Sequence, residues 1–179
     1  MEIIIVRHTT PNIEKGICYG QVDIDVTATF SEELQPILKE LKSIDFDHIY
    51  ASPLQRCKKL AEKISTNITF DNRLKELDFG DWELKKWDDI PAEEINPWME
   101  NFVEVPVTNG ESYIDLNNRV VNFLQEIEKL NTKNIVIVTH AGVMRCIWAH
   151  YNNIPLDKTF ELKLTYGQIL KISTDKLND

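Results

Sequence analysis

The sequence has few cysteines and no long apolar run, and these absences exclude several classes of protein. Its three cysteines, Cys18, Cys57 and Cys146, are odd in number and have no C-x-x-C spacing. A disulfide framework or a zinc knuckle is therefore not expected, and the thiols should be free. No apolar stretch approaches the roughly 20 residues of a membrane-spanning helix. The apolar run near the start is too short for a secretory signal and lacks its basic residues, so we expect a cytoplasmic protein.

Positive charge is also scarce. The 20 Lys and Arg residues are outnumbered by 29 Asp and Glu residues, which gives a formal net charge of −9. An acidic surface repels nucleic acid and anionic membranes, so we expect neither as a partner. The same charge repels a phosphorylated small molecule. A phosphate site in this chain therefore requires a local cluster of positive side chains.

Short apolar runs alternate with helical periodicity, and no internal repeat or flexible linker interrupts them. The predicted strands are residues 3–6, 48–51, 67–70, 135–138, 160–164 and 169–172, and the predicted helices are 34–41, 52–64, 113–130 and 141–151. This alternation predicts an α/β fold with a mostly parallel central sheet. The length fits one domain over residues 1–179, with an irregular, partly helical insertion at about residues 81–109.

Local signals mark two helix starts and the insertion. Ser52 before Pro53, with Gln55 three residues after Ser52, predicts a capped helix. Ser112 followed by Asp115 predicts a second cap. The insertion holds three of the four tryptophans, which are compatible with a core, a lid or an interface.

Both continuous apolar runs end in a histidine. Arg7-His8 follows the run at residues 3–6, and His140 follows the run at residues 135–138. Ligands of open α/β sheets bind beyond the carboxyl ends of the strands, so parallel neighbours would bring these histidines together. Arg56, in the first turn of the helix after the strand at 48–51, would reach the same edge. Two guanidinium groups, which suit phosphate oxygens, and two imidazoles would then surround one point.

This set of side chains is suited to phosphoryl transfer. Phosphate monoesters are among the slowest substrates to hydrolyse spontaneously. One neutral imidazole can attack phosphorus to form a covalent intermediate, while the other, protonated, helps bind the phosphate. Glu76 is the candidate proton donor to the leaving group, and Asp78 is its nearest competitor. Each of these residues alone is common in proteins, so the prediction depends on their coincidence.

Five motifs occur in a familiar order. They are Val6-Arg7-His8, Ser52-Pro53-Leu54-Gln55-Arg56, Leu74-x-Glu76-x-x-Phe79-Gly80, Gly110-Glu111-Ser112 and Thr139-His140-Ala141-Gly142. With these motifs the chain resembles the histidine phosphatase superfamily, in its phosphoglycerate-mutase-like branch 1. The resemblance implies a three-layer α/β sandwich with the site at the carboxyl edge of the sheet. It implies that His8 is the phosphorylated nucleophile, that Arg7, Arg56 and His140 form the phosphate pocket, and that Glu76 donates the proton.

Within the branch, the sequences at residues 7–11, 16–23 and 79–83 are most similar to α-ribazole-5′-phosphate phosphatases. This similarity implies hydrolysis of α-ribazole 5′-phosphate during assembly of the lower ligand of cobalamin. Tyr19 and Gln21 either contact the substrate or only shape a loop. The usual Gly-Glu-Thr after Arg-His is replaced by residues 9–11, and the usual Asn by Glu14, so substrate contacts from this loop should differ.

Other functions than a phosphatase are compatible with parts of this sequence. A phosphoglycerate mutase must protect its phosphoenzyme from water, which the short insertion and the altered loop make less suitable. A broad-specificity sugar phosphatase and a non-catalytic binding module of the same fold remain alternatives. A metallohydrolase would need further ligands beside His8 and His140, and Arg7 and Arg56 would repel a cation. We therefore expect no metal or cofactor, a small phosphate ester as the ligand, and a monomer or homodimer.

Overall fold

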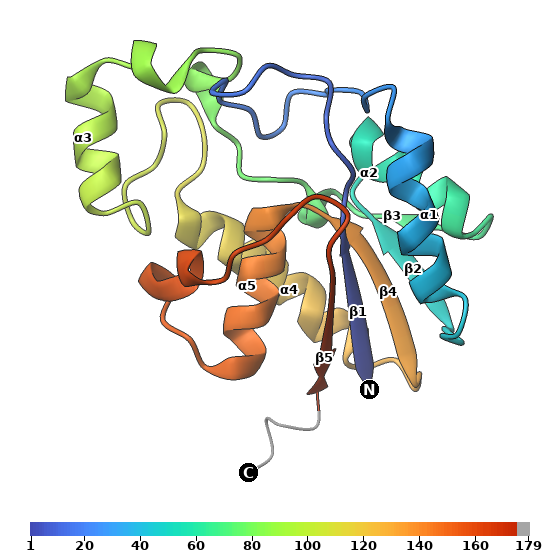
Figure 1. Cartoon of the computed structure of the whole chain (residues 1–179). Coiled ribbons are helices and arrows are strands. Elements are labelled where there is room, and N and C mark those ends of the chain that lie inside the picture. Colours follow the sequence, from blue (N-terminus) through green and yellow to red (C-terminus); the bar gives the residue numbers. More distant parts are fainter. Residues whose placement is uncertain (175–179) are drawn as a thin grey trace.

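The computed structural model describes residues 1–174, which are built around one mixed sheet (Figure 1). Its described strands follow the order β3-β2-β4-β1-β5. They are β1 (Glu2–Arg7), β2 (His48–Ala51), β3 (Thr69–Phe70), β4 (Asn134–Thr139) and β5 (Ile169–Ser173). All neighbours are parallel except β5, which pairs antiparallel with β1. The predicted α/β class and the mostly parallel sheet are confirmed.

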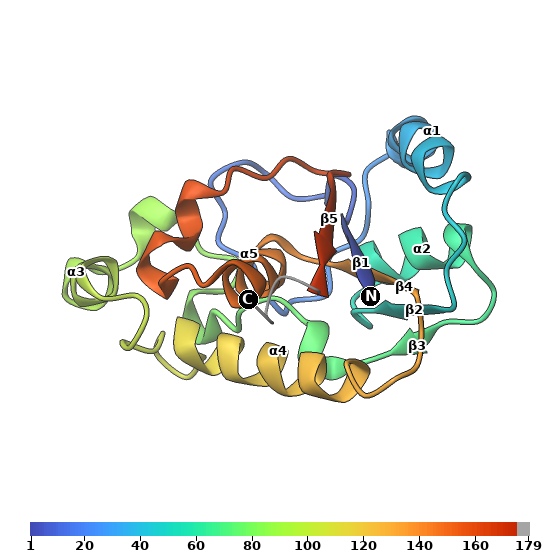
Figure 2. The ribbon, with the colours of Figure 1, turned by 90° about the horizontal axis from the view of Figure 1, so that it is seen from below.

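Helices cover both faces of the sheet, which gives the predicted three layers (Figure 2). Successive strand residues point to opposite faces. Ile4 and Val6 of β1 therefore pack with helices α1 (Phe30–Leu41) and α2 (Gln55–Ile64). Ile3 and Ile5 pack on the other face, with α4 (Tyr113–Ile127) and α5 (Ala141–Asn152). The continuous apolar run at residues 3–6 thus forms a strand that is buried on both faces of the sheet.

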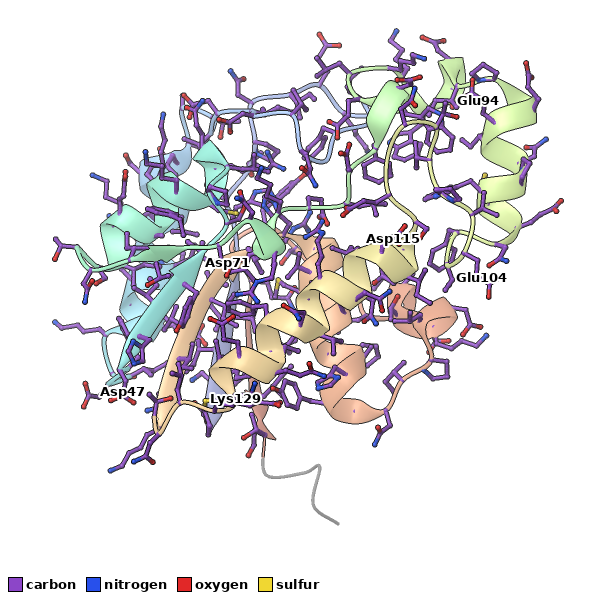
Figure 3. The ribbon with its side chains drawn as sticks, turned by 180° about the vertical axis from the view of Figure 1, so that it is seen from behind. Asp47, Asp71, Glu94, Glu104, Asp115 and Lys129 are labelled. Carbon is purple, nitrogen blue, oxygen red and sulfur yellow. The ribbon has the colours of Figure 1, made fainter. Side chains whose placement is uncertain are left out.

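The insertion forms a small core of its own beside the carboxyl edge of the sheet. It contains the short 3₁₀ helices η2 (Gly80–Trp82) and η3 (Trp87–Asp89) and the helix α3 (Ala92–Glu100); η1 (Asn72–Leu74) precedes it. Trp82 is buried with Cys18, Ile90 and Val107, and Trp87 and Trp98 pack against them. The indole N–H of Trp82 donates to the carboxylate of Glu94 at 2.8 Å. Glu94 lies on α3 and is labelled in Figure 3. Trp82 is therefore a core residue of the insertion, whereas Trp87 and Trp98 are half-buried at its side.

Two local predictions are wrong, and each has a physical reason. Residues 160–164 are not a strand, because β5 occupies the sheet edge beside β1; residues 160 and 161 instead end the 3₁₀ helix η4 (Leu156–Glu161), and irregular chain follows. The apolar side chains of this stretch pack elsewhere; Phe160, for example, lies edge-on to Phe102. Ser52 does not cap a helix, because α2 begins at Gln55, whose amide donates instead to Asp23 Oδ1 at 2.7 Å. The hydroxyl of Ser52 contacts His140.

Other local predictions are confirmed. The capping box at the start of α4 is present, with reciprocal hydrogen bonds between Ser112 and Asp115; Figure 3 labels Asp115 at the start of that helix. That helix ends at Ile127, three residues earlier than predicted from its periodicity. The three cysteines are free and buried. Among residues 1–174, none of the helices combines the length and apolar character needed to span a bilayer.

Candidate active site

The register of β1 and β4 brings His8 and His140 together. Arg7 and Thr139 are partners across the two parallel strands. The next residue of each chain segment is a histidine, and the amide of His8 donates to the Thr139 carbonyl at 3.0 Å. The imidazole centroids lie 5.1 Å apart in an edge-to-face arrangement. The side chains are almost fully buried, with 2% of His8 and 0% of His140 exposed.

A backbone carbonyl determines which nitrogen of His8 can react. Nδ1 of His8 lies 2.7 Å from the carbonyl oxygen of Thr9. A carbonyl only accepts, so Nδ1 must carry the proton in the neutral ring and Nε2 keeps a free lone pair. Burial, and then the guanidinium of Arg56, hold the pKa of His8 well below its usual value. At neutral pH the ring is therefore uncharged, and the lone pair of Nε2 is available.

His140 is also held in the neutral form. Burial lowers its pKa most, followed by the positive charge of Arg56 and the neighbouring His8. Its Nε2 forms a hydrogen bond with the Ser52 hydroxyl at 2.8 Å and lies 3.4 Å from the Cys57 sulfur. Burial in a site with two guanidinium groups disfavours further positive charge, which runs against the expectation that one imidazole is protonated.

The two arginines form a cationic cluster with no carboxylate of residues 1–174 at ion-pair distance. Arg7 donates through Nη1 to the Leu164 carbonyl at 2.8 Å. Arg56, which is 0% exposed, donates to the carbonyls of Val22 at 3.1 Å and of Gly20. Within residues 1–174 neither guanidinium has a carboxylate at ion-pair distance, and the buried Nε of each has no hydrogen-bond partner. Such donors are costly to bury unless an anion satisfies them.

Two tyrosines, which we call the tyrosine clasp, lie over this cluster. The guanidinium of Arg7 lies 4.2 Å from the ring centroid of Tyr166, and that of Arg56 lies 5.5 Å from the ring centroid of Tyr19. The two hydroxyl groups form a hydrogen bond of 2.8 Å. Tyr19 was a predicted substrate contact. Tyr166 was missed, because no motif surrounds it and it lies in the irregular chain before β5.

Glu76 is held beside the first turn of α5. Its Oε1 accepts the amide of Leu77 at 3.0 Å and its Oε2 accepts the amide of Gly142 at 3.1 Å. Its main-chain oxygen accepts Nε2 of Gln21 at 3.2 Å. The side chain of Gln21 thus contacts the Glu76 backbone and does not line the cavity. Asp78 does not line the cavity either, and its carboxylate accepts the amide of Gly80 at 2.9 Å.

The ion pair between Arg119 and Glu111 fixes the segment that carries Glu76. Arg119 on α4 binds both carboxylate oxygens of Glu111 at 2.8 Å. The same guanidinium donates to the carbonyls of Arg73, Lys75 and Glu76 at 2.7–2.8 Å. The Gly110-Glu111-Ser112 motif therefore has a local physical explanation, since Glu111 orients the arginine that holds this segment.

A cavity of about 240 Å³ opens beside these groups. Arg7, His8 and Glu76 form its polar end, and most of the remaining wall is aromatic. The aromatic wall residues are Tyr19, Phe79, Trp87, Trp98, Phe102, Tyr113 and Phe160. Arg145 also lines the cavity; its guanidinium lies 4.6 Å from the Phe160 ring centroid and Nε donates to the Leu162 carbonyl at 3.3 Å. Arg56 and His140 lie outside the wall and are fully buried.

The comparisons with known proteins agree with this architecture. The family described as "Histidine phosphatase superfamily (branch 1)" matches residues 3–177. The chain belongs to the histidine phosphatase superfamily. The match covers almost the whole chain and includes all five motifs and both histidines at the strand ends.

Relatives within the histidine phosphatase superfamily carry several names. The chain is 30% identical to the putative phosphoserine phosphatase 2 of Hydrogenobacter thermophilus, over 95% of this chain and 88% of that protein. It is 26% identical to the adenosylcobalamin/alpha-ribazole phosphatase of Escherichia coli, over 93% and 87% of the two chains. The crystal structure of the alpha-ribazole phosphatase from Shigella flexneri superimposes with a TM-score of 0.90, at 25% identity, over 98% and 92%.

The loop after His8 departs from the usual pattern of the histidine phosphatase superfamily. Thr9 is fully buried, and its hydroxyl has no partner among residues 1–174. Glu14, which replaces the usual Asn, is exposed. Thr10 donates through its amide and hydroxyl to Glu33 on α1 at 2.8 and 3.0 Å. This loop is thus bound to α1.

Proposed function

We propose that this protein is a phosphomonoesterase that transfers the phosphoryl group of a small ester to Nε2 of His8 and then to water. One observation carries the proposal: beside the His8–His140 pair, Arg7 and Arg56 have no carboxylate at ion-pair distance within residues 1–174, and the buried Nε of each has no hydrogen-bond partner. Phosphate oxygens match both the charge and the donor geometry of these groups. The overall charge of −9 would otherwise repel such a ligand.

In the first step, Nε2 of His8 attacks phosphorus and the bond from phosphorus to the ester oxygen breaks. The bonding electrons leave with that oxygen, which takes a proton from Glu76. Arg7, Arg56 and an N–H of His140 bind the phosphoryl oxygens, where negative charge is spread in the transition state. In the second step, Glu76 removes a proton from water, the water oxygen attacks phosphorus, and the P–N bond breaks to release inorganic phosphate and neutral His8.

The first candidate substrate is α-ribazole 5′-phosphate, which would place the enzyme in the assembly of the cobalamin lower ligand. Its leaving group carries a flat benzimidazole. The rings of Trp87, Trp98 and Phe102 in the cavity wall are suited to pack against such a base. The likeness to alpha-ribazole phosphatases supports the same choice.

The second candidate is an ester whose leaving group carries a carboxylate, such as phosphoserine. Arg145 lines the cavity and has no carboxylate at ion-pair distance within residues 1–174. A carboxylate on the leaving group would pair with this guanidinium. The putative phosphoserine phosphatase among the relatives is consistent with this alternative.

A rapid acid- and base-quench experiment tests the mechanism. Wild-type protein mixed with radiolabelled p-nitrophenyl phosphate should retain label that is acid-labile and base-stable, and peptide mapping should place it on His8. His8→Ala should retain none and should not turn over, whereas His48→Ala, which changes an exposed histidine, should behave as wild type. Turnover by His8→Ala at the wild-type rate would contradict the proposal.

A substrate screen distinguishes the two candidates. It compares α-ribazole 5′-phosphate, phosphoserine, 3-phosphoglycerate and sugar phosphates by kcat/KM. If α-ribazole 5′-phosphate is preferred, Arg145→Met should change its kcat/KM by less than about threefold. If phosphoserine is preferred, the same substitution should lower kcat/KM at least about tenfold, the cost of roughly one charged hydrogen bond. Phosphoglycerate isomerisation without phosphate release would favour a mutase instead.

A further inference from the structure

The carboxylate of Glu83 is bound by four backbone amides, although Glu83 does not line the cavity. Oε1 accepts from Gln21 at 2.7 Å and from Phe79 at 3.2 Å. Oε2 accepts from Gly20 at 2.9 Å and from Val22 at 3.1 Å. Three of these amides belong to residues 20–22, which we call the strap. Glu83 therefore fixes the strap through one carboxylate.

The opposite side of the strap holds Arg56. The carbonyls of Gly20 and Val22 accept hydrogen bonds from Nη2 and Nη1 of that guanidinium. The Gly20 carbonyl and the Gln21 amide belong to the same peptide group. A single peptide group therefore links the anion of Glu83 to the cation of Arg56, and each hydrogen bond polarises the group in the sense that strengthens the other.

This indirect link differs from a direct ion pair. A carboxylate placed on the guanidinium itself would compete with phosphate for its donors and would neutralise its charge. Here two of the five N–H groups of Arg56 are used by the strap, and its Nε is buried without a partner. Arg56 is thus oriented while donors remain for a ligand.

The space around Gly20 in the strap is also restricted. A side chain at Gly20 would overlap the Leu77 carbonyl and press against Phe79 and Glu83. Asp23, next to the strap, caps α2 through the amide of Gln55 at 2.7 Å. The strap is therefore fixed by both α2 and Glu83, with little freedom to shift.

We propose that Glu83 is a positioning residue that orients Arg56 for phosphate binding through the Gly20–Gln21 peptide. This inference rests on the proposed role of Arg56 as a phosphate ligand. Removing the charge of Glu83 loosens the strap, and a displacement of about 1 Å at a binding group can cost on the order of 100-fold in rate. Phosphate affinity and turnover should fall together, whatever the leaving group.

The test uses Glu83→Gln, whose amide oxygen still accepts but whose NH₂ group faces backbone donors. We expect the Kd for inorganic phosphate, measured by calorimetry, to rise at least about tenfold, the loss of roughly one hydrogen bond to a charged group. The kcat/KM for p-nitrophenyl phosphate should fall by a similar factor. Glu94→Gln, which changes a carboxylate bound to Trp82 and Thr108, is the matched control and should leave phosphate affinity within about twofold.

A double-mutant cycle separates positioning from general stability. In an Arg56→Ala background, Glu83→Gln should lower kcat/KM by less than about threefold, because its effect passes through Arg56. An equal loss in both backgrounds would overturn the proposal, as would wild-type phosphate affinity in the single variant. If Glu83→Gln does not fold, Glu83→Asp keeps the charge with a shorter reach and should show an intermediate loss. If wild-type protein forms a labelled phosphohistidine and the Glu83 variants keep wild-type phosphate affinity, only this inference is rejected. If wild-type protein forms no labelled phosphohistidine, the proposed function itself is rejected.

Discussion

The amide nitrogen of Gly142 donates to Oε2 of Glu76 at 3.1 Å, and no room remains for a side chain at Gly142. A Cβ at that position would overlap Oε1 of the same carboxylate and press on the side chain of Leu116. The first turn of α5 and the carboxylate of Glu76 therefore fit each other closely, which only glycine permits.

Substitution of Gly142 by Ala should therefore reduce activity more than stability. Alanine is favoured over glycine in helices by about 1 kcal/mol, which offsets part of the strain in α5. The displaced Glu76 carboxylate should lower kcat/KM by at least about tenfold, a part of the roughly 10²–10⁴-fold that acid catalysis supplies. Steady-state kinetics and thermal unfolding measure the two effects. In a Glu76→Ala background, Gly142→Ala should cause little further loss of activity; a full additional loss would show that the substitution acts elsewhere.

Removing the proton from the proposed acid should affect substrates according to their leaving groups. Glu76→Gln keeps the size of the side chain but cannot transfer a proton. We expect kcat/KM to fall about 10²–10⁴-fold for an alkyl phosphate. p-Nitrophenyl phosphate, whose leaving group is stable as an anion, should lose much less. An equal loss for both esters would exclude Glu76 as the acid.

Much of the fold was predictable because its signals are local and strong. The apolar runs at residues 3–6 and 135–138 became β1 and β4, and the capping box at Ser112 starts α4. The apolar residues from 160 to 164 misled, because packing on an aromatic cluster produces the same pattern as strand pairing. The helix cap predicted at Ser52 was wrong for a similar reason. Its hydroxyl matches the pattern of a cap but forms a hydrogen bond with His140.

The positions of site residues could be predicted from the sequence only where a residue directly follows a strand whose direction in the sheet is known. Placing His8 and His140 at strand ends required only parallel neighbours, which the sheet provides. Tyr166 and the Glu83–strap link arise from contacts between loops distant in sequence, and loop conformation is not encoded in periodicity. The protonation of His140 depends on burial beside Arg56, a property of the folded chain.

The tyrosine clasp should restrain access to the phosphate site. The Tyr19–Tyr166 hydrogen bond, 2.8 Å long, joins rings that lie over Arg7 and Arg56. Tyr166→Phe keeps the ring but removes a bond of about 1 kcal/mol. If the clasp must open for phosphate to enter, kcat/KM for p-nitrophenyl phosphate should rise about 2- to 10-fold, within the range of that energy.

Three further variants test whether loss of the Tyr19–Tyr166 hydrogen bond causes the expected increase in kcat/KM. Tyr19→Phe should give the same increase, and the double variant should give no more than either single variant, because all three lack one shared bond. Tyr151→Phe removes a hydroxyl bonded to Glu128 and should leave kcat/KM unchanged. Additive increases in the double variant would show that the hydroxyl groups act separately.

Activity should persist in a metal chelator. The two guanidinium groups beside the imidazoles would repel a cation, and residues 1–174 contain no group of three or more His, Cys, Asp or Glu side chains placed to bind a metal ion. Dialysis against EDTA should leave kcat for p-nitrophenyl phosphate within about 20% of its initial value. Loss of activity that is restored by a divalent ion would require a different mechanism.

Stability should fall as pH decreases below about 6.5, the usual pKa of histidine. Burial and Arg56 lower the pKa of both His8 and His140 in the folded protein, so the unfolded chain binds more protons in this range. The free energy of unfolding then rises with pH, by up to about 1.4 kcal/mol per pH unit for each group. This contribution is fully present above pH 6.5 and is lost as the pH falls towards the folded pKa values. Urea unfolding at pH 7.5 and 5.5 measures the slope, which should be smaller in His140→Asn than in the wild type. If His140→Asn kept the wild-type slope, the imidazole of His140 would not be held neutral by the fold.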